Sequence, residues 1–331
     1  MDLAQEVASL ADEFSGVVRV ERGGTAVLHA AYGLADRRHR IPMTVDSQVA
    51  MASGCKGMTA LAVMSLVEDG TLTLGTTARS LLGEDLPLVA DDVTVEHLLA
   101  HRSGIGDYLD ESVESDIDDY ALSVPVQDLA TTEQFLAVLD GFATRFPAGE
   151  RFEYCNGGYM VLALLAERAS GVDFHDLVRD RVCRPAGMVD TDYLRSDDLP
   201  GRAALGYVAN GRTNVFHLPV VGNGDGGLYT TTADMHRFWA ALFAGVIVSP
   251  SSVALMTRPR SEDIEEGRRY GLGFWLHKDR DIYLLEGYDA GVSFRSLHAP
   301  AEQLTFTVVG TTSDGAWPIA RLLAERLDVV P

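Results

Sequence analysis

The pattern of apolar and polar residues divides the chain into strands, then helices, then strands again, and a last helix. Residues 16–34 alternate apolar and polar around a Gly-Gly turn, which predicts a β-hairpin. Residues 53–69 are apolar nearly all round and are followed by Gly70, which predicts a buried helix with a glycine C-cap. The pattern then stays mostly helical to about residue 200. β-rich segments such as LTFTVVGTT follow, and AWPIARLLAERLDVV predicts a final helix.

This order of elements predicts an α+β protein. Because strands stand at both ends of the chain, we expect them to share one antiparallel sheet flanked by helices. The helical middle then forms an inserted domain. The predicted boundaries place residues 1–75 and 205–331 in a discontinuous sheet domain and residues 76–204 in the mostly helical insertion.

A lysine stands near the start of the helix predicted at residues 53–69. Of the 27 basic residues only two are lysines, Lys56 and Lys278, so a lysine in the most apolar helix departs from an arginine-rich background. Ser53 precedes Lys56 by three positions, and residues at i and i+3 share one face of a helix. A lysine buried in such a helix needs a partner or a role.

The serine and the lysine have a chemical and a structural interpretation. Burial and the partial positive charge of the helix N-terminus both disfavour an ammonium ion, so we expect a depressed pKa for Lys56. A neutral lysine can take the proton of the Ser53 hydroxyl and activate it as a nucleophile. In the structural interpretation, Ser53 is only the N-cap of the helix and Lys56 extends to solvent.

Partners for this pair are expected in the loop before the next long apolar helix. Tyr154 and Asn156 lie there, in the stretch FEYCNGGYM. A phenol and an amide can both hydrogen-bond to a lysine. Alternatively, Asn156 is only the N-cap of that helix and Tyr154 is a core aromatic.

Taken together, these motifs resemble those of the serine β-lactamase and penicillin-binding superfamily, in its class C β-lactamase and esterase-like branch. The S-x-x-K motif of that superfamily matches Ser53 to Lys56, and its Y-x-N motif matches Tyr154 to Asn156. Further stretches are similar to its connecting segments, in the same order: TVEHLLAHRSGI, PAGERFEYCNGGYMVLALLAERASG, RPAGMVDTDY, GDGGLYTTTADMHRFW and YGLGFW.

The resemblance implies a β-lactamase/transpeptidase-like fold and an acyl-enzyme mechanism. Ser53 would attack an acyl carbonyl, Lys56 and Tyr154 would share the general-base work, and Asn156 would position the substrate. The oxyanion is expected between the backbone N–H of Ser53 and an N–H from the edge strand near Gly291.

The third motif departs from the pattern of the superfamily, which has Lys-Thr-Gly or His-x-Gly on that edge strand. The matching stretch here is EGYDAGVSFRS. It puts Tyr288 in the place of Lys or His and Ala290 in the place of Gly, followed by Gly291, and we expect these residues to bind substrate. Without the cation, short p-nitrophenyl esters should be better substrates than penicillins, unless Arg295 supplies the charge.

Charge and composition narrow the partners. A net charge of −21 disfavours nucleic acid and anionic membranes. The start of the chain lacks the pattern of a signal peptide, and no window offers 18 uninterrupted apolar residues, so we expect a cytoplasmic protein without a membrane span. His97 and His101 have the i, i+4 spacing of a metal pair, but no third ligand stands out. We therefore expect no metal and no cofactor.

The expected function is that of a serine hydrolase acting on small esters or amides. One alternative is an acyltransferase that uses the same site to pass the acyl group to an amine or alcohol. Another is a catalytically inactive binding protein that kept the fold. The natural substrate and the oligomeric state do not follow from the sequence.

Overall fold

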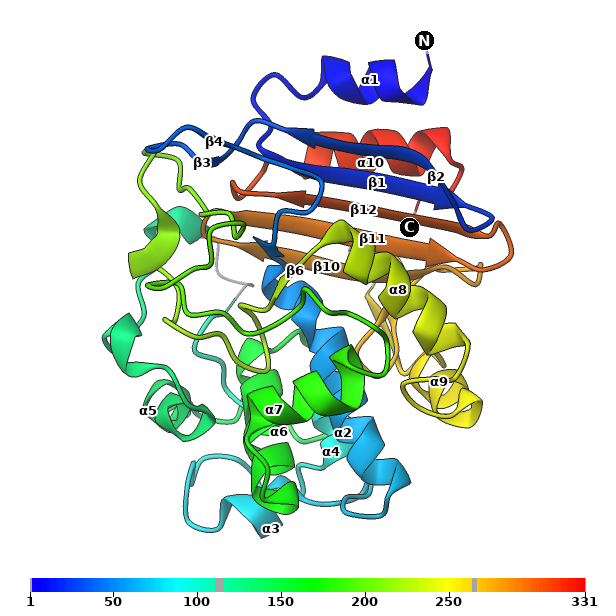
Figure 1. The fold of residues 1–331 in the computed structure, drawn as a ribbon. Helices are drawn as coiled ribbons and strands as arrows, with labels where there is room; N and C mark the ends of the chain where they lie inside the picture. The colour runs from blue at the N-terminus through cyan, green and yellow to red at the C-terminus, as the bar shows by residue number, and fades with distance from the viewer. Residues whose placement is uncertain (1, 111–115, 264–266, 331) are drawn as a thin grey trace.

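An antiparallel sheet of eight strands runs through the computed structural model, which describes residues 2–110, 116–263 and 267–330 (Figure 1). The strands lie in the order β2-β1-β12-β11-β10-β9-β8-β7. Their bounds are β1 (Gly16–Arg22), β2 (Thr25–Tyr32), β7 (Ser261–Asp263), β8 (Arg268–Tyr270), β9 (Trp275–Leu276), β10 (Tyr283–Asp289), β11 (Val292–Ala299) and β12 (Leu304–Gly310). Strand β1 pairs with β12, with Gly16 opposite Gly310. The prediction that strands from both ends of the chain share one antiparallel sheet is confirmed.

Helices cover both faces of this sheet (Figure 1). On one face lie α1 (Leu3–Ser9) and α10 (Trp317–Arg326), and Leu323 of α10 belongs to the same apolar cluster as Val18 and Phe306. The helices on the side of the opposite face include α2 (Lys56–Glu68), α8 (Thr232–Phe243) and α9 (Pro250–Met256). Because side chains alternate between faces along a strand, the sheet contributes to an apolar core on each side.

Helix α2 lies in the core of the molecule, and every residue from Lys56 to Leu66 is buried. The 3₁₀ turn η1 (Ala52–Cys55) precedes it, and Gly70 follows its end with a φ of +82°. Burying one large apolar side chain contributes about 1.5 to 3 kcal/mol. Packing of this kind fixes the helix, and with it the turn at its start. The buried helix predicted at residues 53–69 is confirmed, with a 3₁₀ turn as its first turn.

The part of the chain between α2 and α8 consists of short helices and one long helix, joined by loops. Its helices are α3 (Ala78–Leu82), α4 (Val95–Leu99), η2 (Ile117–Asp119), η3 (Val126–Asp128), η4 (Thr132–Phe135), α5 (Leu136–Leu139), α6 (Asn156–Ser170), α7 (Phe174–Val178), the π-helical η5 (Arg179–Cys183) and η6 (Asn214–Phe216). The short strands outside the large sheet are β3 (Leu34–Asp36), β4 (Ile41–Pro42), β5 (Val49–Ala50) and β6 (Tyr229–Thr230). The division into two domains, at 75/76 and 204/205, stays a prediction. Within the described ranges, the helices are all too short or too polar to cross a membrane.

Candidate active site

Ser53 lies in the turn η1, between β5 and α2. Ala52, directly before it, has a φ of +43°, in the left-handed region that costs a non-glycine residue about 1 to 2 kcal/mol. The N–H of Gly54 donates to the carbonyl of Met51 at 2.9 Å and closes the turn. Ser53 is partly exposed, whereas its neighbours on both sides are buried. The turn therefore presents the serine hydroxyl at the end of a buried helix.

The Lys56 side chain is 2% exposed and lies beside Ser53. Its Nζ donates to Ser53 Oγ at 2.8 Å, to Asn156 Oδ1 at 2.8 Å and to the backbone carbonyl of Asp225 at 2.9 Å. These three contacts offset the cost of burying the polar end of the Lys56 side chain. The interpretation in which Lys56 extends to solvent does not describe this arrangement.

Asn156 is the first residue of α6, and a carboxylate that the sequence analysis missed holds it in place. Asp107 accepts the backbone N–H of Asn156 at 2.6 Å and that of Gly157 at 2.8 Å. Since the first N–H groups of a helix have no partner within it, Asp107 supplies the acceptors that they need. The Asn156 side chain is thereby left to face Lys56. Burial raises the pKa of Asp107 to about 6, against the lowering effect of the N–H donors.

The Tyr154 ring lies over the end of the Lys56 side chain, with 5.0 Å between Nζ and the ring centroid. Trp275 stacks on this ring at 6.0 Å with an interplanar angle of 9°, and the His101 ring lies at 4.3 Å. His101 Nδ1 also accepts the N–H of Cys155 at 3.1 Å. The structure thus places Tyr154 and Asn156 against Lys56, which contacts Ser53.

The two histidines that have the spacing of a metal pair take part in other contacts. His97 Nδ1 accepts the N–H of Thr94 at 3.3 Å and completes a capping box at the start of α4. Burial, and to a smaller extent the charge of Lys56, lowers the pKa of His101 well below its usual value. A neutral His101 fits its role as the acceptor for the loop that carries Tyr154. Over the described part of the chain, no three His, Cys, Asp or Glu side chains are grouped as metal ligands would be.

The residues expected to form the third motif make their contacts with other parts of the chain than Ser53 and Lys56. Tyr288 is 45% exposed, and its ring lies 6.4 Å from that of the first residue of α10. The carbonyl of Ala290 accepts Asn214 Nδ2 at 2.9 Å, and the N–H of Gly291 donates to Ser313 Oγ at 2.8 Å. The backbone groups of Ala290 and Gly291 are therefore used within loops.

Alternation along β10 explains this difference. Leu285 and Gly287 face α2, whereas Tyr288 lies on the face of α10. A Cβ at Gly287 would lie 2.2 Å from the carbonyl oxygen of Met51 and 2.9 Å from the nitrogen of Gly54. Gly287 is thus the residue whose missing side chain lets the strand approach the nucleophile turn. Two positions before Gly287, the residue on the same face of β10 is the apolar Leu285. Tyr288 lies on the opposite face.

Arg295, the alternative cation, also lies on the face of α10. It forms an ion pair with Glu286, and its guanidinium carbon is 5.5 Å from the ring centroid of Trp317. Both Tyr288 and Arg295 are directed away from the face of β10 that meets η1, and the expected role of the third motif in substrate binding stays a prediction. A one-residue change along a strand moves a side chain to the opposite face.

Ser53 lies at the start of a buried helix and contacts Lys56, which the first residue of α6 also contacts. This arrangement is suited to acyl transfer through a serine ester. The chain belongs to the family described as Beta-lactamase, whose model matches residues 3–328.

The chain is similar to proteins named as a penicillin binding protein, a D-aminopeptidase and an esterase. A solved structure of a penicillin binding protein from Bacillus halodurans is 34% identical, with a TM-score of 0.91 and coverage of 98% of this chain and 100% of that one. A D-aminopeptidase of Brucella anthropi is 30% identical over 80% of this chain and 49% of its own length. Esterase EstB of Burkholderia gladioli is 34% identical over 58% of this chain and 49% of its own length. The chain spans about half the length of these two curated relatives.

Proposed function

We propose that this chain is a serine hydrolase that forms an acyl-enzyme on Ser53 and hydrolyses small esters or amides. The observation that carries the proposal is the 2.8 Å contact between Lys56 Nζ and Ser53 Oγ inside a buried site. This distance is within the reach that a general base requires. Relatives named as an esterase and a D-aminopeptidase support an activity on acyl carbonyls.

In the proposed reaction, Ser53 Oγ attacks the acyl carbonyl while its proton passes to Lys56 or Tyr154. The tetrahedral intermediate then collapses, and the departing alcohol or amine takes up that proton. Water attacks the ester on Ser53 in a second step and releases the acid and the free serine. Asn156 holds Lys56 through Oδ1 and is the group that we expect to position the substrate.

We place the oxyanion between the N–H of Ser53 and that of Tyr288, the residue that follows Gly287. Among the described residues, strand β9 pairs with β10 only at Tyr283 and Leu284, so the later part of β10 is left to approach η1. The N–H of Gly291, which the sequence analysis considered, already donates to a serine side chain. Removing one oxyanion donor typically lowers the rate by a factor of about 100 to 1,000.

Transfer of the acyl group to an amine or alcohol would use the same residues, and no observation on this chain favours it over hydrolysis. A catalytically inactive binding protein would not need Lys56 in contact with a partly exposed serine. The expected cytoplasmic location stays a prediction.

The test is intact-mass spectrometry after incubation with a fluorophosphonate and, separately, with p-nitrophenyl acetate. One adduct per chain is expected on the unmodified protein and none on Ser53→Ala. Ser80→Ala, at an exposed serine, is the matched control and should label like the unmodified protein. An adduct of equal yield on Ser53→Ala would overturn the assignment of the nucleophile.

A further inference from the structure

A hollow opens beside the nucleophile turn, and the proposed reaction does not use it. Its walls come from β5, from the loop that precedes β6, from the end of β10 and from the helical part of the chain. Gly226 lies between the nucleophile turn and a carboxylate. A Cβ there would be 3.9 Å from the carbonyl carbon of Ala52 and 3.9 Å from Asp289 Oδ2. A group bound in the hollow therefore lies close to an acyl carbon held at Ser53.

Two carboxylates line the hollow, Asp225 and Asp289, and none of the described residues in its walls is a Lys, Arg or His. Asp225 is 7% exposed, and its Oδ2 accepts the hydroxyl of Tyr108 at 2.6 Å. Asp289 Oδ1 accepts the N–H of Ala290 at 2.9 Å. Burial raises the pKa of Asp225, against the lowering effect of the nearby Lys56 charge. A cation in the hollow would face both carboxylates at once, in surroundings where charge interactions are stronger than in water.

The hollow also contains a buried side-chain amide, that of Asn223. Asn223 is 1% exposed, and neither Nδ2 nor Oδ1 has a hydrogen-bond partner among the described residues. Ser196 also lines the hollow, and its buried Oγ is likewise unpaired there. Buried polar atoms are nearly always hydrogen-bonded in native proteins, so these atoms point to a polar ligand.

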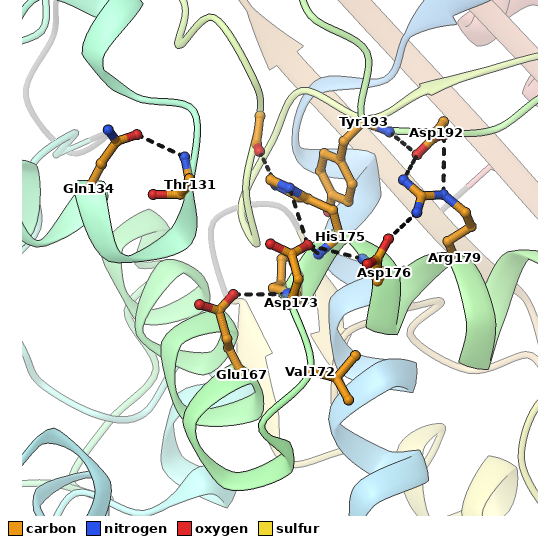
Figure 2. A network of polar contacts seen from close by, with 12 residues as sticks. Thr131, Gln134, Glu167, Val172, Asp173, His175, Asp176, Arg179, Asp192 and Tyr193 are labelled. Carbon is orange, nitrogen blue, oxygen red and sulfur yellow. Dashed lines mark hydrogen bonds and ion pairs between the residues drawn. The ribbon is translucent and has the colours of Figure 1, made fainter.

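Two hydrogen bonds from neighbouring helices fix the loop that carries Asn223 and Asp225. His175 Nε2, on α7, donates to the carbonyl of Gly222 at 2.9 Å, and Thr59 Oγ1, on α2, donates to the carbonyl of Gly224 at 2.6 Å. Figure 2 shows His175 packed against Tyr193, with 4.6 Å between the ring centroids. Polar groups fixed in this way bind a ligand without first having to be ordered.

We propose that this hollow binds the protonated amino group of the acyl donor, so that the substrates are aminoacyl esters and amides. The three N–H donors of a primary ammonium group match the carboxylates of Asp225 and Asp289 and the amide oxygen of Asn223. This inference rests on the proposed function, since Ser53 attacks the carbonyl of the same substrate.

Binding is tested first in the Ser53→Ala background, where no reaction interferes. Isothermal titration with glycinamide and with propionamide compares a cation with a neutral molecule of nearly the same shape. Glycinamide should bind at least about tenfold more tightly, and Asp289→Asn should remove about tenfold of that preference. Glu84→Gln, which removes one exposed negative charge outside the hollow, is the control. Equal affinities for the two amides would overturn the proposal.

Kinetics on the unmodified protein separate this proposal from the proposed function. The ratio of kcat/KM for the p-nitrophenyl esters of glycine and propionic acid, each corrected for buffer hydrolysis, should fall about tenfold in Asp289→Asn and in Asp225→Asn. An unchanged ratio in both variants overturns the binding site, even where the propionyl ester acylates Ser53. Absence of an adduct from either ester overturns the proposed function, and the titration then still decides the binding site.

Discussion

The two elements that meet at the nucleophile turn contribute different kinds of groups. The start of α2 contributes a side chain, Lys56, whose N–H donors contact Ser53, Asn156 and a backbone carbonyl. The end of β10 contributes backbone at Gly287, where any Cβ would meet the turn. On the helix side the site depends on which residue is present, and on the strand side it depends on the space that a glycine leaves. Substitutions should therefore break the two sides in different ways.

The largest effect is expected on the helix side, at Lys56. Arginine keeps the positive charge but cannot accept a proton, so Lys56→Arg should be nearly as damaging as Lys56→Ala. Loss of a general base lowers the rate by a factor of about 100 to 10,000. The burst of p-nitrophenol from p-nitrophenyl acetate measures acylation directly. Lys278→Arg is the matched control, and turnover of the Lys56→Arg variant at the level of the unmodified protein would show that only charge matters.

On the strand side, Gly287→Ala should be the most damaging change. The added methyl group would lie 2.2 Å from the carbonyl oxygen of Met51, so the turn or the strand must move. We expect acylation to fall by about 100-fold and the free energy of unfolding by about 1 to 3 kcal/mol. Gly201→Ala is the control, because no atom lies within 4 Å of a Cβ at that position. Full activity of Gly287→Ala would show that the approach of β10 to the turn is not needed.

The same contrast shows how far the sequence leads. In a helix the i, i+3 spacing itself places two side chains on one face, so Ser53 and Lys56 could be paired without a structure. In a strand, the face of each residue depends on the register, and the alignment of β10 that puts Tyr288 in the third motif selects a side chain on the face of α10. The order of strands and helices was enough to predict the antiparallel sheet with strands from both ends of the chain.

Other parts of the site leave no local signal in the sequence. Asp107 lies in a loop far from α6 in the chain, and only the folded structure shows that it caps this helix. Asp225 and Asp289 come from a loop and from a strand end, and tertiary packing alone brings both to one hollow. No periodic pattern marks contacts of this kind.

Asp107→Asn should have a smaller effect, because it loosens the start of α6 without removing a reacting group. Asparagine keeps one of the two acceptor oxygens, and loss of an N-terminal acceptor costs about 0.5 to 2 kcal/mol, so we expect a loss of stability of about 1 kcal/mol. We expect a tenfold or smaller loss of acylation, through Asn156 and its contact with Lys56. Chemical denaturation at pH 7 and ester kinetics measure the two effects, with Asp140→Asn as an exposed control. Unchanged stability would show that the cap is dispensable.

The pH dependence of this variant has a definite sign. The pKa of Asp107 is about 6 in the folded protein, above its ordinary value of 3.8, so the folded state binds this proton more tightly than the unfolded state. The contribution of Asp107 to stability is therefore fully present below about pH 4 and declines as the pH rises through 6. The difference in unfolding free energy between the unmodified protein and Asp107→Asn should shrink between pH 4 and pH 7. A difference that grows over this interval would contradict the raised pKa.

The smallest effect is expected for Tyr288→Lys, although the alignment of the third motif predicts a shift of about fivefold toward substrates that carry a carboxylate. Tyr288 is 45% exposed and faces α10. Burial and the charges of Asp314, Asp116 and Asp118 raise the pKa of its hydroxyl, so acidic side chains surround this position. A lysine there would interact with these carboxylates instead of a substrate at Ser53. The ratio of kcat/KM for a penicillin to that for p-nitrophenyl acetate should therefore change by less than about twofold, with Tyr288→Phe as the control. A fivefold rise in that ratio would place the side chain of residue 288 at the substrate after all, and would restore the alignment in which it stands for the lysine of the third motif.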